Sequence, residues 1–151
     1  MYGIDKLYSE HRELIALTQA LVDMVAQPGP PPAPELANAR WKIARLISTH
    51  LASEDTLVRQ PLMASPFTDD QIAVAQYSRD LQTVRTAFVE HNFRWSTGTA
   101  MANWAEYGVA VREQYDALAR RAAWEEEEIF PRARAIASIG GMMATHRVAA
   151  A

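Results

Sequence analysis

Apolar residues recur at three- and four-residue steps along most of this chain, and no stretch alternates apolar with polar residues as a strand does. The repeat predicts an all-α fold with four helices. The first two span about residues 4–27 and 35–62, and the sequence Pro28-Gly29-Pro30-Pro31-Pro32-Ala33-Pro34 between them cannot be helical. The third helix carries residues 84–95, and the fourth carries residues 115–129 and ends at Pro131.

A chain of 151 residues suits one domain. We expect an up-down-up-down four-helix bundle over residues 1–137, because such bundles pack successive helices against one another. From Ser138 onward small residues and glycine predominate, which predicts a flexible C-terminal tail over residues 138–151.

Composition excludes several classes of protein. The chain has no cysteine, so disulfides, thiolate metal sites and cysteine nucleophiles are ruled out, and nitrogen and oxygen remain as the strong ligands. A net charge of -3 gives no basic surface for nucleic acid. No apolar run approaches the roughly 20 residues that span a bilayer. Residues 1–7 lack the apolar core of a signal peptide, so we expect a cytoplasmic protein, and a homodimer stays open.

Polar residues interrupt the apolar stripes where leucine or isoleucine is expected. The pair His50 and Glu54 is flanked on both sides by apolar residues three and four positions away, and His11 stands likewise on the first helix. A buried carboxylate without a partner is so costly that it must be protonated, ion-paired or bound to a metal. A single such histidine is usually a core residue, but the whole set favours a metal site. The candidate ligands are His11, His50, Glu54, His91 and Glu125.

Spacing along the chain gives an independent test of the first two helices. In an up-down bundle, residues that meet at one level are about equidistant from the turn that joins their helices. The midpoint between His11 and the pair His50 and Glu54 falls inside the proline run. On a helix, residues four positions apart share a face, so that pair can aim an imidazole and a carboxylate at one point.

The other two turns are harder to place. The midpoint between His91 and Glu125 falls at Gly108, a reasonable helix stop. The connection between the second and third helices has its midpoint within residues 69–80. We expect these residues either to overhang the site or to form a separate turn. The segment Ser96-Thr97-Gly98-Thr99 is a rival place for the third turn.

Several short motifs, taken in order, resemble the hemerythrin-like HHE domains. They are Glu10-His11-Arg12, His50-x-x-x-Glu54-Asp55, Glu90-His91 and a Glu-rich stretch that runs into Ile129-Phe130-Pro131. The resemblance covers residues 5–133. It implies a duplicated unit, in which a histidine on one helix is followed by H-x-x-x-E on the next, and a pair of irons bridged by Glu54 and Glu125.

The chain departs from this pattern at Arg121. The second unit should carry a histidine four residues before Glu125, and arginine offers no lone pair to a metal. We therefore expect one or two irons per chain. If the metal has been lost altogether, Arg121 should pair with Glu125 and hold the site closed. Glu126 to Glu128 are expected to form a solvated acidic face, and His146 lies outside the site.

The function implied by the resemblance is binding of a small oxidant or diatomic ligand (dioxygen, peroxide or nitric oxide) at non-haem iron, as carrier, sensor or scavenger. Imidazole and carboxylate ligands also suit manganese. Two alternatives stay open. One is an enzyme that consumes peroxide or nitric oxide at the same irons, and the other is a metal-free bundle that serves as an interaction module.

Overall fold

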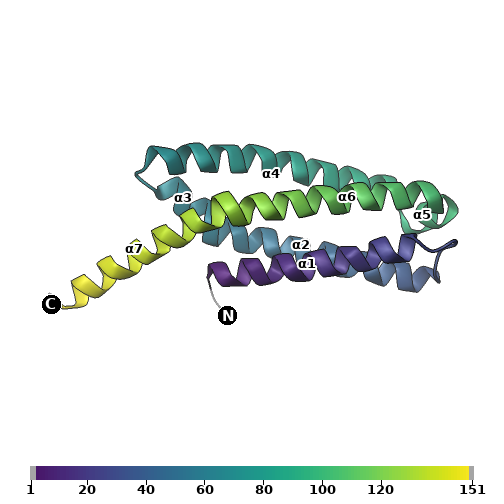
Figure 1. Ribbon diagram of the computed structural model, residues 1–151, viewed down its shortest axis with the longest axis horizontal. Coiled ribbons are helices and arrows are strands. Elements are labelled where there is room, and N and C mark those ends of the chain that lie inside the picture. Colours follow the sequence, from purple (N-terminus) through teal and green to yellow (C-terminus); the bar gives the residue numbers. More distant parts are fainter. Residues whose placement is uncertain (1–2, 150–151) are drawn as a thin grey trace.

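The computed structural model describes residues 3–149, and all regular structure in that range is helical (Figure 1). The all-α class predicted from the apolar repeat is therefore confirmed. In chain order the elements are α1 (Ile4–Val25), α2 (Ala33–Glu54), the π-helix η1 (Asp55–Arg59), α3 (Gln60–Ala64), α4 (Thr68–Arg94), α5 (Thr97–Ala102), α6 (Trp104–Trp124), the π-helix η2 (Glu125–Ile129) and α7 (Phe130–Ala149). No helix within the described residues is both long and apolar enough to cross a membrane.

Helix α1 packs against both α2 and α6. The proline run reverses the chain, so α2 returns along α1, and the Lys6 ammonium donates a hydrogen bond to the Ser53 hydroxyl at 2.8 Å. At the other end of α1, the Trp104 indole N–H donates to the Gln27 carbonyl at 3.1 Å. These contacts hold α1 in register with both neighbours.

Each π-helix ends two residues before a proline. Pro61 and Pro131 each lack an N–H, and the proline ring clashes with the carbonyl four residues back, so the helix widens locally instead of breaking. The amides of Gln60 and Phe130 accordingly bond to carbonyls five residues earlier. The expectation that Pro131 ends the fourth helix was wrong, because α7 continues beyond it. The segment expected as a tail is helical as far as Ala149, and its flexibility stays a prediction.

The ends of α4 also differ from expectation. Helix α4 begins at Thr68, so residues 69–80 are helical and form no separate turn, and Tyr77 within them reaches Glu54 with its hydroxyl. The Ser65 hydroxyl fixes the preceding turn by donating to Asp70 Oδ2 at 2.5 Å. The next turn is the rival segment, where the Ser96 hydroxyl accepts the Thr99 amide N–H at 3.1 Å and caps α5.

Gly108 was expected to stop a helix and instead lies inside α6, buried against α1. A Cβ at this position would meet Val25 at 3.5 Å and the flexible end of Arg112 at 3.4 Å, which are ordinary contacts. We expect Gly108→Ala to raise the free energy of unfolding by about 0.5–1 kcal/mol, because alanine loses less backbone entropy in a helix. Urea denaturation measures the change, and a destabilised variant would show that α6 and α1 need the closer approach.

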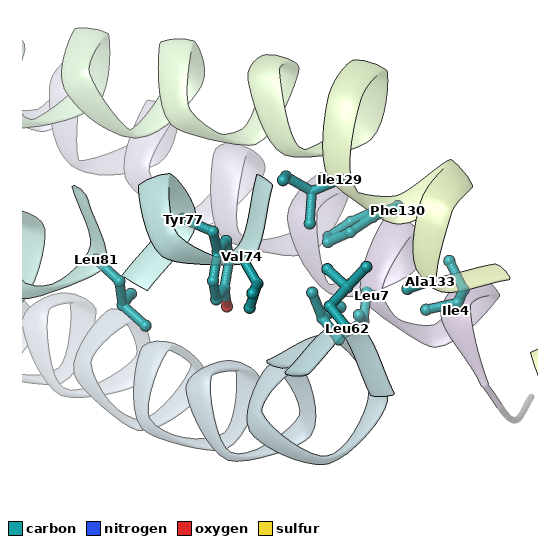
Figure 2. Packing of buried hydrophobic residues seen from close by; sticks show 10 residues of the cluster. Ile4, Leu7, Leu62, Val74, Tyr77, Leu81, Ile129, Phe130 and Ala133 are labelled. Atoms are coloured by element: carbon teal, nitrogen blue, oxygen red, sulfur yellow. The ribbon is translucent and has the colours of Figure 1, made fainter. Parts of the chain in front are cut away.

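The buried apolar residues form two clusters. The first gathers the start of α1, η1, α3, the first half of α4 and the η2–α7 junction (Figure 2), and contains Ile4, Leu7, Val58, Leu62, Val74, Tyr77, Leu81, Ile129, Phe130 and Ala133. The second includes Leu14, Leu21, Val25, Leu36, Ile43, Trp95, Trp104, Tyr107 and Val111. Along α1, α2 and α6 the two clusters are separated by a layer of buried polar residues.

Candidate metal centre

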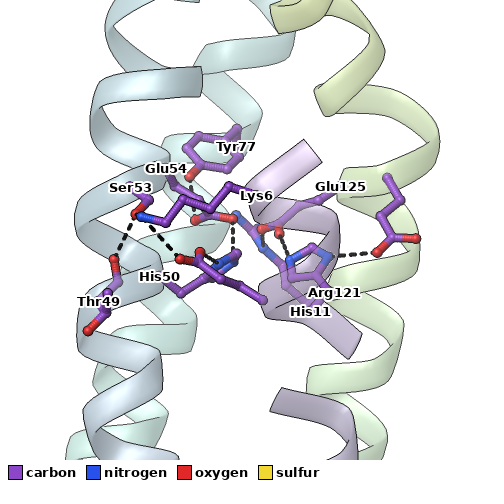
Figure 3. A network of polar contacts seen from close by, with 11 residues as sticks. Lys6, His11, Thr49, His50, Ser53, Glu54, Tyr77, Arg121 and Glu125 are labelled. Carbon is purple, nitrogen blue, oxygen red and sulfur yellow. Dashed lines mark hydrogen bonds and ion pairs between the residues drawn. The ribbon is translucent and has the colours of Figure 1, made fainter. Parts of the chain in front are cut away.

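Four buried side chains meet in this polar layer (Figure 3): His11 from α1, His50 and Glu54 from the last turn of α2, and Glu125 from the first residue of η2. Each offers one ligand atom, and these atoms all lie within 4.8 Å of one another. The rings of His11 and His50 are 4.7 Å apart between centroids. The prediction that His50 and Glu54 are buried and face His11 is confirmed.

His50 is held by a carboxylate on each ring nitrogen. Nδ1 lies 2.8 Å from Oε2 of Glu10, and Nε2 lies 3.0 Å from Oε1 of Glu54. Burial disfavours the charged imidazole. The hydrogen bond and negative charge of Glu54, the hydrogen bond of Glu10 and the charge of Glu125 outweigh burial and raise the pKa of His50. A carboxylate on Nδ1 fixes the tautomer that leaves Nε2 free to bind a metal.

His11 has the same arrangement. Its Nδ1 lies 2.9 Å from Oε1 of Glu126, and its Nε2 lies 3.2 Å from Oε2 of Glu125. Its ring also stacks on Phe130, with 5.0 Å between centroids, so the imidazole plane is fixed by packing as well. Both histidines thus point Nε2 inward and Nδ1 at an outer carboxylate.

The inner carboxylates are in different environments. Burial alone would raise the pKa of Glu54, but the hydrogen bond and charge of His50, with a 2.7 Å hydrogen bond from the Tyr77 hydroxyl, lower it to about 2. Burial, with the nearby charge of Glu54, raises the pKa of Glu125 even though His11 and Arg121 oppose the shift. The contact of His50 with Glu54 joins Nε2 to Oε1 at 3.0 Å but at a poor angle, so Oε1 is only weakly satisfied.

Arg121 closes one side of the layer. Its Nε donates to Oε1 of Glu125, one helical turn away. Its guanidinium carbon lies 4.9 Å from the centroid of the Tyr77 ring and 5.0 Å from that of Trp124, so the cation contacts two aromatic rings. This is the Arg121–Glu125 pair expected from the sequence for a bundle without metal.

The donor set fits a divalent cation. With Nδ1 donating outward, each histidine turns a lone pair toward a carboxylate oxygen about 3 Å away, a contact that needs a proton or a metal ion between the two atoms. Lys6 and Arg121 offset two of the layer's carboxylates, Glu10, Glu54, Glu125 and Glu126, so two negative charges remain when the imidazoles are neutral. A divalent ion would neutralise the layer and satisfy Oε1 of Glu54.

His91 does not join the other predicted ligands. It lies on α4 fourteen residues beyond Tyr77, about 21 Å along the helix at 1.5 Å per residue. Its ring stacks on Tyr107 at 6.2 Å, and burial with the charge of Arg40 lowers its pKa. The expectation failed because the third turn lies at Ser96 and not at Gly108, which moves His91 to the far end of α4.

Sequence reasoning missed Tyr77, Glu10 and Glu126. For Tyr77 a signal existed, since the midpoint between Glu54 and Tyr77 falls at the turn after α3. Glu126 was assigned to a solvated face, yet it is only 37% exposed and contacts His11. Glu127 and Glu128 are exposed as expected, and so is His146.

Comparisons of this chain with protein-family models, with curated proteins and with solved structures find no match. The four buried residues of the polar layer form a group that could hold a metal ion.

Proposed function

We propose that this chain is a hemerythrin-like, non-haem iron protein. In this proposal the fold is an up-down-up-down bundle with four arms. The first arm is α1, the second is α2 together with α3, the third is α4, and the fourth is α6 together with α7. The iron lies in the polar layer and is held by His11, His50, Glu54 and Glu125. The observation that carries the proposal is the buried convergence of these ligands, with an outer carboxylate on each histidine.

We further propose that one iron binds per chain. In the resemblance to the HHE pattern, a second iron would take a histidine from α4 and another from four residues before Glu125. The side chains at this level are Tyr77 and Arg121, which hydrogen-bond Glu54 and Glu125. Neither a neutral phenol nor a guanidinium replaces an imidazole as a ligand.

When bound, iron would supply open coordination positions for dioxygen, peroxide or nitric oxide. The ligands present are two imidazoles and two carboxylates, a set typical of iron and manganese. A cavity of about 550 Å³ reaches the layer and gives a small ligand access. The proposed role is to bind such a ligand as carrier, sensor or scavenger.

Elemental analysis of protein expressed with iron and then desalted tests the proposal. We expect about one iron per chain in the wild type and in His146→Ala, and loss of iron in His50→Ala. His91→Ala should keep its iron, because His91 lies far from the layer. Glu10→Gln should weaken iron binding by about 10–100-fold, since outer partners of ligand histidines contribute that much. Wild-type protein without any transition metal would refute the proposal.

One observation favours a second candidate, a metal-free bundle that acts as an interaction module. Arg121 already neutralises Glu125 inside the layer, so part of the site's charge is balanced without a metal. The same elemental analysis separates the two candidates. For the module, we expect no bound metal in the wild type and equal stability with and without a chelator.

A further inference from the structure

The cavity beside the polar layer is much larger than a diatomic ligand requires. Its volume of about 550 Å³ lies in the range of small-molecule sites. It lies where the second half of α4 is poorly covered, and Val84 on its wall is 41% exposed. Its apolar walls include Leu14, Ile43, Ile47, Val84, Phe88 and Val111.

Two unpartnered polar groups belong to residues that line this cavity. Nε of Arg121 donates to Glu125 and the guanidinium contacts the rings of Tyr77 and Trp124, but Nη1 and Nη2 are buried without a hydrogen-bond partner. The Tyr107 hydroxyl is also buried without a partner. Buried donors are rarely left unpaired, so these groups mark the cavity as a binding site.

We propose that this cavity binds an apolar monocarboxylic acid. The carboxylate accepts two parallel hydrogen bonds from Nη1 and Nη2 of Arg121, and the hydrocarbon chain lies along the apolar walls. A guanidinium presents a planar pair of donors that matches a carboxylate. The nearby rings of Tyr77 and Trp124 restrict the movement of the guanidinium.

The charge of the layer restricts the ligand to a single negative charge. Glu54 and Glu125 lie beside the proposed carboxylate position and would repel a phosphate or a dicarboxylate. A carboxylate bound beside these two inner carboxylates is destabilised by their charge, so a divalent cation held in the layer should tighten its binding. The inference therefore rests on the proposed function, and it predicts tighter carboxylate binding in iron-loaded than in metal-free protein.

Calorimetric titration with octanoate tests the proposal, with 1-octanol as the uncharged probe of similar shape. Iron(II)-loaded wild type should bind octanoate at least about tenfold more tightly than octanol, since hydrogen bonds to charged groups contribute that much. Arg121→Met should lose this preference, and Arg121→Lys should keep only part of it. Arg120→Met is the matched control, because Arg120 is adjacent and exposed, and it should bind like the wild type.

A second variant leaves the charged groups in place. Ala87→Trp should fill the cavity from exposed α4 and weaken both probes, while its iron content stays that of the wild type. Equal binding of octanoate and octanol, no binding of octanoate, or unchanged binding in Arg121→Met would each overturn the inference. Iron content is measured on the same samples, so protein that binds octanoate through Arg121 without holding iron would refute the proposed function and keep the carboxylate site.

Discussion

Loading the protein with iron(II) at a free concentration of 100 times its Kd should raise the melting temperature by about 5–11 °C. A ligand that binds only the native state contributes about 2.7 kcal/mol at that concentration. For a chain of this size, each kcal/mol moves the melting temperature by about 2–4 °C. The effect should extend to the whole fold, because the four ligands come from α1, α2 and η2 and join segments far apart in the sequence.

Differential scanning calorimetry with and without a chelator measures the shift. His50→Ala is the control, since it removes one ligand and should melt at the same temperature in both conditions. His91→Ala should shift as the wild type does. If loaded wild-type protein melts as the chelated protein does, the ion is not bound between helices and the proposed centre is wrong.

Part of this site could be predicted from sequence for a simple reason. His11, His50 and Glu54 interrupt apolar stripes on two helices, and a proline run fixes the turn between them. The apolar stripes and the position of the turn together determine which residues of the two helices meet. The contribution of α1 and α2 to the polar layer could therefore be predicted from helix geometry alone. Glu125 was found from the motif that follows it.

The contribution of the third helix to the site was predicted wrongly, because Gly108 was interpreted as the end of a helix. Gly108 looks like a helix stop in isolation, but it lies inside α6 and is buried against Val25 of α1. The actual turn depends on the Ser96 cap, a weaker signal in the sequence. Moving the turn from Gly108 to Ser96 replaces His91 by Tyr77 at the level of the site.

The outer shell of the layer also depends on packing across helices. Glu10 and Glu126 are sequence neighbours of His11 and Glu125, and adjacent residues on a helix do not share a face. Their contacts with His50 and His11 arise because α1 lies between α2 and α6. A single helix viewed alone assigns both glutamates to solvent.

The double substitution Tyr77→His with Arg121→His should raise the iron content from one to two per chain. Tyr77 and Arg121 stand on the far side of the two inner carboxylates from His11 and His50, and each already contacts one of them. Arg121 precedes Glu125 by four residues, as His50 precedes Glu54. The double variant would therefore repeat the existing ligand arrangement on that side, and it would remove a permanent positive charge.

Elemental analysis of the single and double variants decides the matter. Arg121→His alone should stay near one iron per chain. It adds a single imidazole, and α4 still presents Tyr77 at this level, which is a poor metal ligand when its phenol is neutral. Tyr77→His alone should also stay near one, because the Arg121 guanidinium repels a second cation. A unit charge at about 6 Å in an effective dielectric near 20 repels a divalent ion by about 5 kcal/mol. A double variant that folds and still holds one iron would contradict this prediction. In that case Glu54 and Glu125 do not bridge two irons, and features other than Tyr77 and Arg121 limit the centre to a single metal.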